Sequence, residues 1–255
     1  MPVDSEISSG LSAVTPAQWA ALAEGRFFFG HQSVGRNIVD GMVDLLAEHR
    51  EIPLMIAESR NFGARPAFYH ATVGRNQFPQ EKLDEFAAIV DRSLGGERGI
   101  AMLKFCPADV RPDSDPQALF DAYRQQTDVL KANHPMLTVV HLTMPLARSE
   151  SWRGVVKKRL RGQMLERDRN VVRNRYNTLI RETYSGREPV FDIAQLESTL
   201  PDGSRLFLMA GTDTVYTMSS LYASDAAHLN EVGRRMVAEQ LLIFLARLAG
   251  GRAAG

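Results

Sequence analysis

Two short segments near opposite ends of the chain carry residue types that together can attack an ester. Ser33 lies in GHQSVG (30–35), and Asp225 and His228 lie three residues apart in DAAHLN (225–230). In serine hydrolases a histidine takes the proton of the nucleophilic serine, and a carboxylate orients that histidine. Each segment also has an ordinary structural explanation. Ser33 can be a helix N-cap, and Asp225 can be a capping residue beside a surface histidine.

The elements around these residues predict an α/β fold. Ser33 follows a short apolar run, RFFFG (26–30), and precedes a segment with an apolar stripe at helical spacing (34–50). Further strands are predicted at 53–59, 99–106, 136–145 and 188–194. Further helices are predicted at 15–25, 80–94 and 115–134, in a segment ending near 184, and at 229–249, with irregular stretches at 60–79 and 195–224.

The predicted strands are continuous apolar runs, which is typical of strands covered on both faces. Together with the strand–helix alternation, they predict a three-layer α/β/α sandwich with a mostly parallel five-stranded sheet. In such sheets ligands bind at the carboxyl ends of the strands. Ser33 and the Asp225/His228 pair are therefore expected at the same sheet edge. We expect a single domain over 15–249, with flexible ends at 1–14 and 250–255.

The two segments resemble the conserved blocks of one enzyme family. FFFGHQSVG (27–35) resembles the first block of the SGNH (GDSL-like) hydrolases, although His31-Gln32-Ser33 replaces Gly-Asp-Ser. SDAAHLNEVGRRM (224–236) is similar to the last block, including the spacing of Asn230 and Gly233. The resemblance implies a flavodoxin-like fold and a serine esterase without a cofactor. It also implies that Ser33 attacks the ester, that His228 is general base and then general acid, and that Asp225 orients His228.

The resemblance also implies an oxyanion hole made of the serine N–H, a glycine after the second strand and an asparagine after the third. Gly74 is the candidate glycine, with Gly63 as the weaker alternative. Where the family has G-x-N-D, this chain reads CPAD (106–109), so an alanine replaces the asparagine. Losing such a donor costs roughly 3–4 kcal/mol of transition-state stabilisation. Asn76 or Asn61 is expected to replace it, or the activity is lower or different.

Three other histidines have different expected roles. His31, two residues before Ser33, is a candidate for contact with substrate, and His70 is a candidate site residue in the long loop. His141 lies inside a predicted strand, which favours a core histidine with satisfied hydrogen bonds. The sequence has neither H-x-x-H nor H-E-x-x-H spacing, so no metal site is expected.

Composition restricts the expected classes of binding partner and the expected cellular location. Thirty basic and thirty acidic residues leave the chain formally neutral, so neither nucleic acid nor a membrane is an expected partner. A single cysteine and the lack of a signal-peptide pattern favour a cytoplasmic location. Residues 153–175 nevertheless hold nine Lys or Arg against two acidic residues. This segment either docks an anionic polymer or partner or is a solvated helix face.

The leading hypothesis is an esterase that removes a small acyl group, such as an O-acetyl group, from a small-molecule or carbohydrate ester. An alternative is a weakly active or inactive carbohydrate-binding or interaction module on the same fold, which the alanine in CPAD (106–109) favours. A third is a protein that binds its partner through the basic segment. The stretch 206–222 is expected either to form a hairpin beside the site or to be a packed loop.

Overall fold

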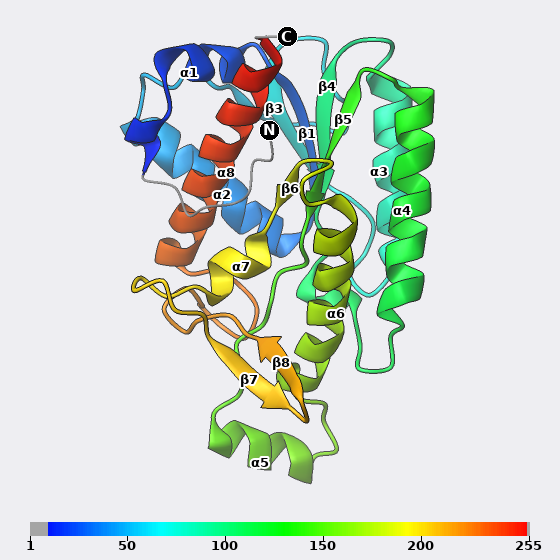
Figure 1. The fold of residues 1–255 in the computed structure, drawn as a ribbon, viewed down its shortest axis with the longest axis vertical. Coiled ribbons are helices and arrows are strands. Elements are labelled where there is room, and N and C mark those ends of the chain that lie inside the picture. Colours follow the sequence, from blue (N-terminus) through cyan, green and yellow to red (C-terminus); the bar gives the residue numbers. More distant parts are fainter. Residues whose placement is uncertain (1–9, 254–255) are drawn as a thin grey trace.

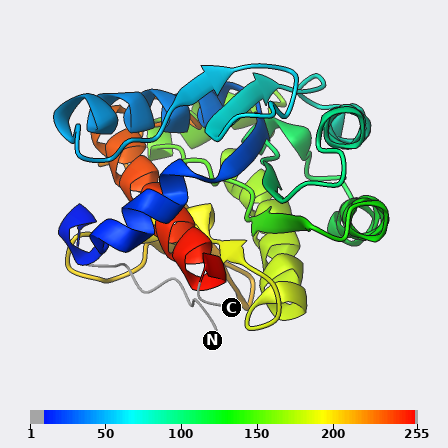
Figure 2. The same ribbon diagram turned by 90° about the horizontal axis from the view of Figure 1, so that it is seen from above.

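The computed structural model describes residues 10–253, which form a twisted parallel sheet between two layers of helices (Figures 1 and 2). The expected flexible ends fall partly outside this range, at 1–9 and 254–255. The strands are β1 (Arg26–His31), β2 (Ile56–Glu58), β3 (Ala67–Thr72), β4 (Gly99–Leu103), β5 (Leu137–Leu142), β6 (Val190–Phe191), β7 (Phe207–Ala210) and β8 (Asp213–Tyr216).

The helices largely follow the predicted segments. They are α1 (Pro16–Ala23), α2 (Ser33–Glu48), α3 (Pro79–Ser93), α4 (Pro116–Asn133), α5 (Trp152–Leu160), α6 (Glu166–Tyr184), α7 (Ile193–Ser198) and α8 (Glu231–Ala253), with short 3₁₀ turns at Leu11–Ala13 and Pro107–Asp109. Thr15 caps α1 through a capping box with Gln18. Within residues 10–253 no helix is long and apolar enough to cross a membrane.

The central sheet has six parallel strands in the order β2-β3-β1-β4-β5-β6, rather than the five predicted. The additional strand is β3, which lies in the stretch predicted to be irregular. Its sequence AFYHAT is largely apolar, but the Asn, Gly, Arg and Pro residues that precede it are typical of a loop, so the strand was not predicted. The stretch 206–222 contains the antiparallel hairpin β7–β8, so it is not a plain packed loop. Its residues 212–215 line a cleft that does not include Ser33 or His228, so the expected place of the hairpin beside the site is not shown.

The triple phenylalanine of β1 explains why the sheet is buried on both faces. Phe27 and Phe29 belong to the buried cluster that includes residues of α1, α2 and α8, whereas Phe28 belongs to the cluster that includes residues of α3, α4 and α6. All three side chains are fully buried. The chain leaves β1 toward one side of the sheet and returns to β4 on the other, so β1 and β4 flank the point where ligands bind in such folds.

Polar side chains from α6 and α7 hold the loop that follows β5. Asn177 exchanges two hydrogen bonds with the backbone of Met144, at 2.7 and 2.9 Å. Glu197 accepts a hydrogen bond from the Leu146 N–H at 2.6 Å and is fully buried. Burial raises the pKa of Glu197 to about 8, although the bond from Leu146 and the nearby Lys104 lower it. The carboxyl group is therefore largely protonated at neutral pH.

This raised pKa gives a testable pH dependence of stability. Because folded Glu197 keeps its proton up to about pH 8 while the unfolded side chain loses it near 4.5, stability falls between these values. We expect the wild type to lose up to about 1.4 kcal/mol per pH unit relative to Glu197→Gln. Urea unfolding of both proteins at pH 5, 6, 7 and 8 measures this. A constant difference across the series would show that Glu197 titrates normally.

Candidate active site

Ser33 lies at the carboxyl edge of the sheet, as the first residue of α2. The helix N-cap is Gln32, so the capping explanation for Ser33 is wrong. Gln32 makes no side-chain bond to the first turn of the helix. Instead its Nε2 donates to the carbonyl oxygens of Val73 (2.9 Å) and Gly74. The first-turn amides of α2 thus receive no side-chain cap, and the Ser33 hydroxyl is exposed beside them.

The structure brings Ser33, His228 and Asp225 together in one hydrogen-bonded line. His228 Nε2 lies 2.9 Å from Ser33 Oγ, across 195 residues of sequence. His228 Nδ1 lies 2.7 Å from Asp225 Oδ2. With Nδ1 protonated and donating to the carboxylate, Nε2 is free to accept the serine proton. The side chains of His228 and Asp225 are 41% and 58% exposed, so this is an open surface site.

The Asp225 carboxylate is ionised at neutral pH. Partial desolvation raises its pKa, but hydrogen bonds from the backbone N–H groups of Ala227 and His228 and from the His228 ring outweigh this and lower it to about 2. Both backbone bonds reach Asp225 Oδ1 at 2.8 Å. One carboxylate oxygen therefore fixes the turn, and the other remains for the imidazole. An anion in this position stabilises the imidazolium that forms when His228 accepts a proton.

Close packing of α2 against α8 brings the segment that carries Ser33 next to the segment that carries His228 (Figures 1 and 2). A Cβ on Gly41 would lie 2.5 Å from the Arg234 carbonyl oxygen, so only glycine allows this approach. Nearer the site, Asn37 Oδ1 accepts a hydrogen bond from the Leu229 N–H at 3.3 Å. Asn37 lies one helical turn after Ser33, so it ties the residue after His228 to the helix that carries the serine.

Asn37→Ala tests this tie. Removing the amide releases the loop that carries His228, and small misplacements of a general base slow proton transfer. We expect kcat for ester hydrolysis to fall roughly tenfold with little change in KM. Steady-state kinetics of Asn37→Ala and Asn37→Asp separate the roles, since the aspartate keeps an acceptor for the Leu229 N–H. Equal loss in both variants would assign Asn37 a purely structural role.

Two further contacts hold the loop that carries Asp225 and His228. Asn230 caps α8 by accepting from the Gly233 N–H at 2.9 Å, and its Nδ2 donates to the Leu221 carbonyl at 2.8 Å. The Arg148 N–H donates to the Ala226 carbonyl at 2.7 Å. The loop after β5 therefore also contacts the segment between Asp225 and His228. Asn230 thus ties this loop to the first turn of α8 and to Leu221.

Gly74 and Asn76, the candidate oxyanion-hole residues, use their polar groups in hydrogen bonds within the protein. The Gly74 N–H donates to Glu85 Oε2, so this amide is engaged within the protein. Gly74 has φ +55°, and a Cβ there would clash with the backbone of Lys82. Asn76 is exposed, and its Oδ1 accepts from Lys82 Nζ at 2.9 Å. These bonds assign both residues to holding the β3–α3 loop.

His31 and His70 are paired beneath the site and do not line it. His31 Nε2 lies 3.1 Å from His70 Nδ1, and the side chains are nearly inaccessible to solvent. Burial lowers the pKa of His31 to about 3 and lowers that of His70, so both are neutral at neutral pH. Contact of His31 with substrate, expected from its nearness to Ser33, is thus a wrong prediction. A strand residue two positions away points into the core below α2.

His141 meets the expectation of a satisfied core histidine. Its Nδ1 lies 2.9 Å from the Tyr123 hydroxyl, and its Nε2 lies 3.1 Å from Glu188. Among the described residues, no group of three or more His, Cys, Asp or Glu side chains is arranged to hold a metal ion.

A buried ion pair stands where the family pattern has asparagine and aspartate. Asp109 accepts two hydrogen bonds from Lys82 Nζ, at 2.6 and 2.8 Å, and both side chains are fully buried. Asp109 also accepts from the backbone N–H groups of Cys106 (2.7 Å) and Gln77 (3.0 Å). One carboxylate thus joins the loops after β3 and β4. The motif CPAD (106–109) keeps the structural aspartate and lacks the asparagine.

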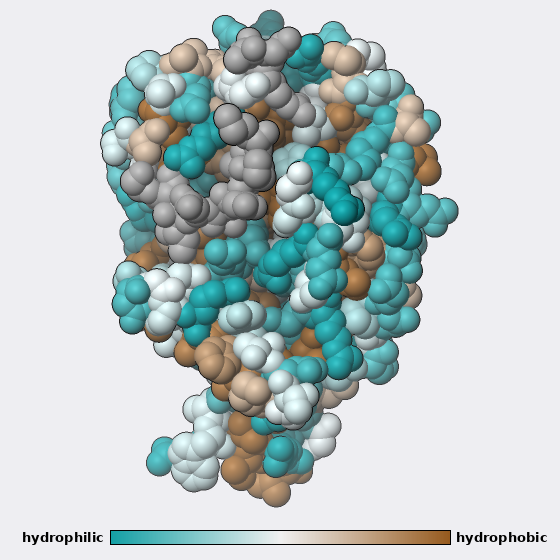
Figure 3. Space-filling model, viewed as in Figure 1, coloured by the Kyte–Doolittle hydropathy of each residue, from teal (hydrophilic) through white to brown (hydrophobic). Residues whose placement is uncertain are grey.

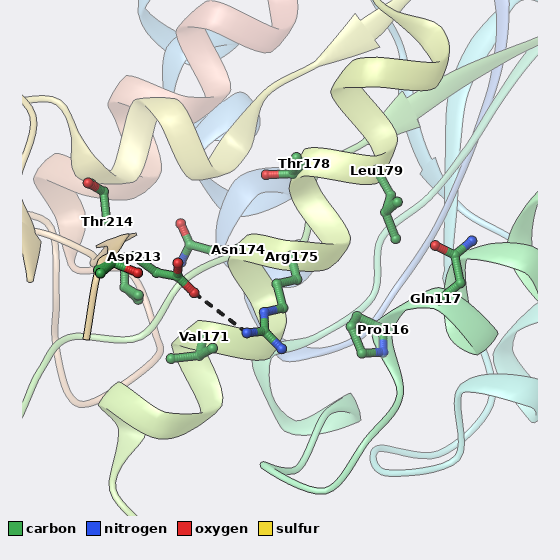
Figure 4. A pocket seen from close by; sticks show the side chains of 11 residues that line it. Pro116, Gln117, Val171, Asn174, Arg175, Thr178, Leu179, Asp213 and Thr214 are labelled. Carbon is green, nitrogen blue, oxygen red and sulfur yellow. Dashed lines mark ion pairs between the residues drawn. The ribbon is translucent and has the colours of Figure 1, made fainter. Parts of the chain in front are cut away.

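A cleft of about 560 Å³ lies away from Ser33, between α6, the start of α4 and the β7–β8 hairpin (Figure 4). Arg175 and Asp213 face each other across it at 3.5 Å. None of its lining residues belongs to the Ser33–His228–Asp225 line. Ser33 therefore does not line this cleft.

Sequence patterns could predict the three residues of the Ser33–His228–Asp225 line but not the residues that hold them in place. Gln32, Asn37 and Arg148 act through single hydrogen bonds across the fold. Asn37 carried one usable signal, since a polar residue one turn after a nucleophile lies on the same helix face. The Arg148 contact is made by the backbone, so its side-chain type carries no signal at all.

Comparison with known proteins gives structural matches only. No model of a known protein family matches the sequence, and no curated protein matches it significantly. A Bacteroides fragilis protein, provisionally described as an acylhydrolase, has 12% identity and a TM-score of 0.51, covering 91% of this chain and 94% of its own. A GDSL-like lipase from Bacteroides thetaiotaomicron has 13% identity and a TM-score of 0.50, covering 94% and 100%.

A third structure agrees with these two. It is a Desulfitobacterium hafniense protein, provisionally described as a lipolytic protein of the G-D-S-L family. It has 10% identity and a TM-score of 0.50, covering 86% of this chain and 99% of its own. Identities this low establish a shared fold and nothing finer.

Proposed function

We propose that this chain, whose fold is that of the GDSL-like hydrolases, is a serine esterase with Ser33 as its nucleophile. The observation that carries the proposal is the hydrogen-bonded line from Ser33 Oγ through His228 to Asp225. Three residues from two distant segments meet in the order and at the distances that nucleophilic catalysis requires. The alternative, a surface histidine beside a capping aspartate, does not explain why a serine hydroxyl lies within hydrogen-bonding distance of that histidine.

The mechanism follows from which atoms face one another. His228 Nε2 takes the proton of Ser33 as Oγ attacks the ester carbonyl, and the carbonyl oxygen becomes an oxyanion. Collapse of this intermediate expels the alcohol, which receives the proton from His228, and leaves an acyl group on Oγ. Water then attacks the acyl-enzyme with His228 again as base. Collapse of the second intermediate returns the proton from His228 to Ser33 and releases the acid.

The first turn of α2 supplies the oxyanion donors in this proposal. Its amides receive no cap from the Gln32 side chain, and they lie at the positive end of a 16-residue helix. The negative charge on the carbonyl oxygen develops beside Ser33, so these N–H groups are the nearest preorganised donors. Because Gly74 and Ala108 add none, we expect turnover below that of an esterase with a complete three-donor hole.

A short acyl group is the substrate feature that the site supports best. Ser33 is exposed, the His228 side chain is 41% exposed, and neither residue lines the cleft between α6, α4 and the β7–β8 hairpin or the smaller cleft formed by residues 158–169. An open site also admits a bulky alcohol part such as a sugar. We therefore propose acetyl esters, including O-acetyl carbohydrates, as the substrate class.

A series of p-nitrophenyl esters tests this proposal. We expect kcat/KM to be highest for acetate and to fall with butyrate and octanoate, because a longer acyl chain on this exposed surface would stay largely in water and gain little from burial. Release of acetate from an O-acetylated oligosaccharide tests the alcohol side separately. Hydrolysis at the buffer rate for every ester would reject the esterase function.

A second candidate is a binding module that retains the fold without efficient turnover. It is favoured by one observation, the engagement of the Gly74 amide by Glu85 together with the alanine at position 108. Calorimetric titration with acetylated and deacetylated oligosaccharides separates the two. Binding without acetate release would support the module, whereas acetate release that depends on Ser33 would reject it.

A further inference from the structure

Helix α5 projects from the end of the molecule at which the central strands terminate (Figure 1). It runs from Trp152 to Leu160, and none of its residues is buried. The Ser151 side chain caps it by accepting from the Gly154 N–H at 3.3 Å. Lys158, on the side facing the protein, pairs with Glu150. The helix is thus anchored by polar contacts at one side and presents its other side to solvent.

An apolar stripe covers the exposed side of α5. Trp152, Val156 and Leu160 follow one another at intervals of one helical turn, and they are 73%, 47% and 83% exposed. Met164, just beyond the helix, is 44% exposed. Figure 3 shows apolar side chains gathered at this lower end of the molecule. Soluble surfaces expose single apolar residues, but an aligned stripe on an unpartnered helix marks an interaction site.

Basic side chains border this stripe on both sides. Successive residues of a helix are turned by about 100°, which places Arg159 along one border of the stripe and Arg153 and Lys157 along the other. All three side chains are exposed. The Arg153 guanidinium also lies 5.8 Å from the Trp152 ring centroid. An apolar stripe between two basic borders is the pattern of a helix that lies in the interface of a membrane.

Other occupants fit this surface less well. A second copy of the chain would bring the two basic borders together, and like charges at an interface cost several kcal/mol. An anionic polymer would use the basic side chains but would leave the apolar stripe in water. An acidic protein would need roughly 800 Å² of complementary surface, and a single projecting helix offers little concave area. An anionic lipid surface satisfies the apolar stripe and both basic borders at once.

We propose that α5 binds the surface of membranes that contain anionic lipids. Trp152, Val156 and Leu160 enter the boundary between headgroups and acyl chains, and Arg153, Lys157 and Arg159 meet lipid phosphates. The neutral net charge of the chain suggested no membrane partner, because composition does not reveal how charges and apolar residues are grouped. This peripheral binding does not depend on the proposed esterase activity.

The loop that leads into α5 also touches the candidate active site. Arg148 donates its backbone N–H to Ala226, between Asp225 and His228. Docking through α5 therefore holds the sheet edge that carries Ser33 near the membrane surface.

Trp152 provides a direct spectroscopic test. The chain has two tryptophans, and Trp19 is 8% exposed in the core, so Trp19→Phe leaves Trp152 as the sole reporter. We expect vesicles of 30% phosphatidylglycerol in phosphatidylcholine to shift its emission to the blue, and brominated lipids to quench it. Pure phosphatidylcholine vesicles should give at most a tenth of the binding. No shift and no sedimentation with the anionic vesicles at low salt would overturn the proposal.

Two substitutions with matched controls assign the binding to α5. Leu160→Glu and Lys157→Glu should each weaken vesicle binding at least tenfold. Val129→Glu and Arg65→Glu, which change exposed residues elsewhere, should leave it within twofold. Circular dichroism and thermal unfolding verify the fold of each variant. Equal vesicle binding by the variants and the controls would overturn the lipid assignment. So would a dimer in solution that Leu160→Glu abolishes. A protein that binds heparin but not vesicles, and whose heparin binding Leu160→Glu leaves unchanged, would overturn it as well.

Discussion

Ser33→Ala is expected to lower kcat for p-nitrophenyl acetate by about 10⁴-fold or more, because it removes the atom that forms the acyl-enzyme. KM should change little, since the serine methylene and the surrounding surface remain. The comparison is made by steady-state kinetics on proteins with matched unfolding temperatures. Any residual rate would come from donors at the start of α2, which still stabilise an oxyanion formed by direct attack of water.

Three further variants test whether the loss is specific to Ser33 and His228. His228→Ala should cost about as much as Ser33→Ala, and the double variant should be no slower than either alone, because the groups act as a unit. Ser220→Ala removes another exposed serine and should leave kcat unchanged. Multiplicative losses in the double variant would mean that Ser33 and His228 act independently, contrary to the mechanism.

Asp109→Ala is expected to be the most destabilising single substitution among these proposals. It leaves the Lys82 ammonium buried without its counter-ion and removes the acceptor for the Cys106 and Gln77 N–H groups. Breaking a buried ion pair in this way costs about 3–5 kcal/mol of unfolding free energy. Urea unfolding at pH 7 measures this loss.

Two comparison variants separate the cost of an unpaired buried charge from the cost of the lost hydrogen bonds. Asp109→Ala with Lys82→Met should recover part of the loss, because no unpaired charge remains. Asp121→Ala, which breaks an exposed ion pair with Arg124, should cost less than about 1 kcal/mol. A loss at Asp109 as small as that at Asp121 would contradict the burial of this pair.

Much of the fold could be predicted from the sequence because apolar runs and helical stripes report burial directly. The strand at RFFFG (26–30) and helices α2, α3, α4 and α8 lie within a few residues of their predicted bounds, whereas α5 and α7 were not predicted as separate helices. The sixth strand, Ala67–Thr72, was missed because the polar and turn-forming residues before it resemble a loop. Only its pairing with β1 and β2 makes it a strand, and pairing partners far apart in sequence leave no local pattern.

The candidate site divides in the same way. That Ser33, Asp225 and His228 lie together could be predicted, because their residue types and local spacing fit one chemistry and the carboxyl ends of parallel strands meet at one sheet edge. The direction of the His31 side chain could not be predicted, since it depends on which face of β1 lies under α2. The hydrogen bond from the Gly74 N–H to Glu85 likewise depends on tertiary contacts. The position of Gly74 after the second predicted strand therefore did not reveal that its N–H is used within the protein.

The identity of the nucleophile can be measured by locating the adduct of a fluorophosphonate probe by mass spectrometry of the digested protein. The probe reacts with serines that a neighbouring base activates, so we expect one adduct, on Ser33, that is lost in His228→Ala. An adduct on a different residue, or no adduct on native protein, would contradict the assignment of Ser33 as the nucleophile.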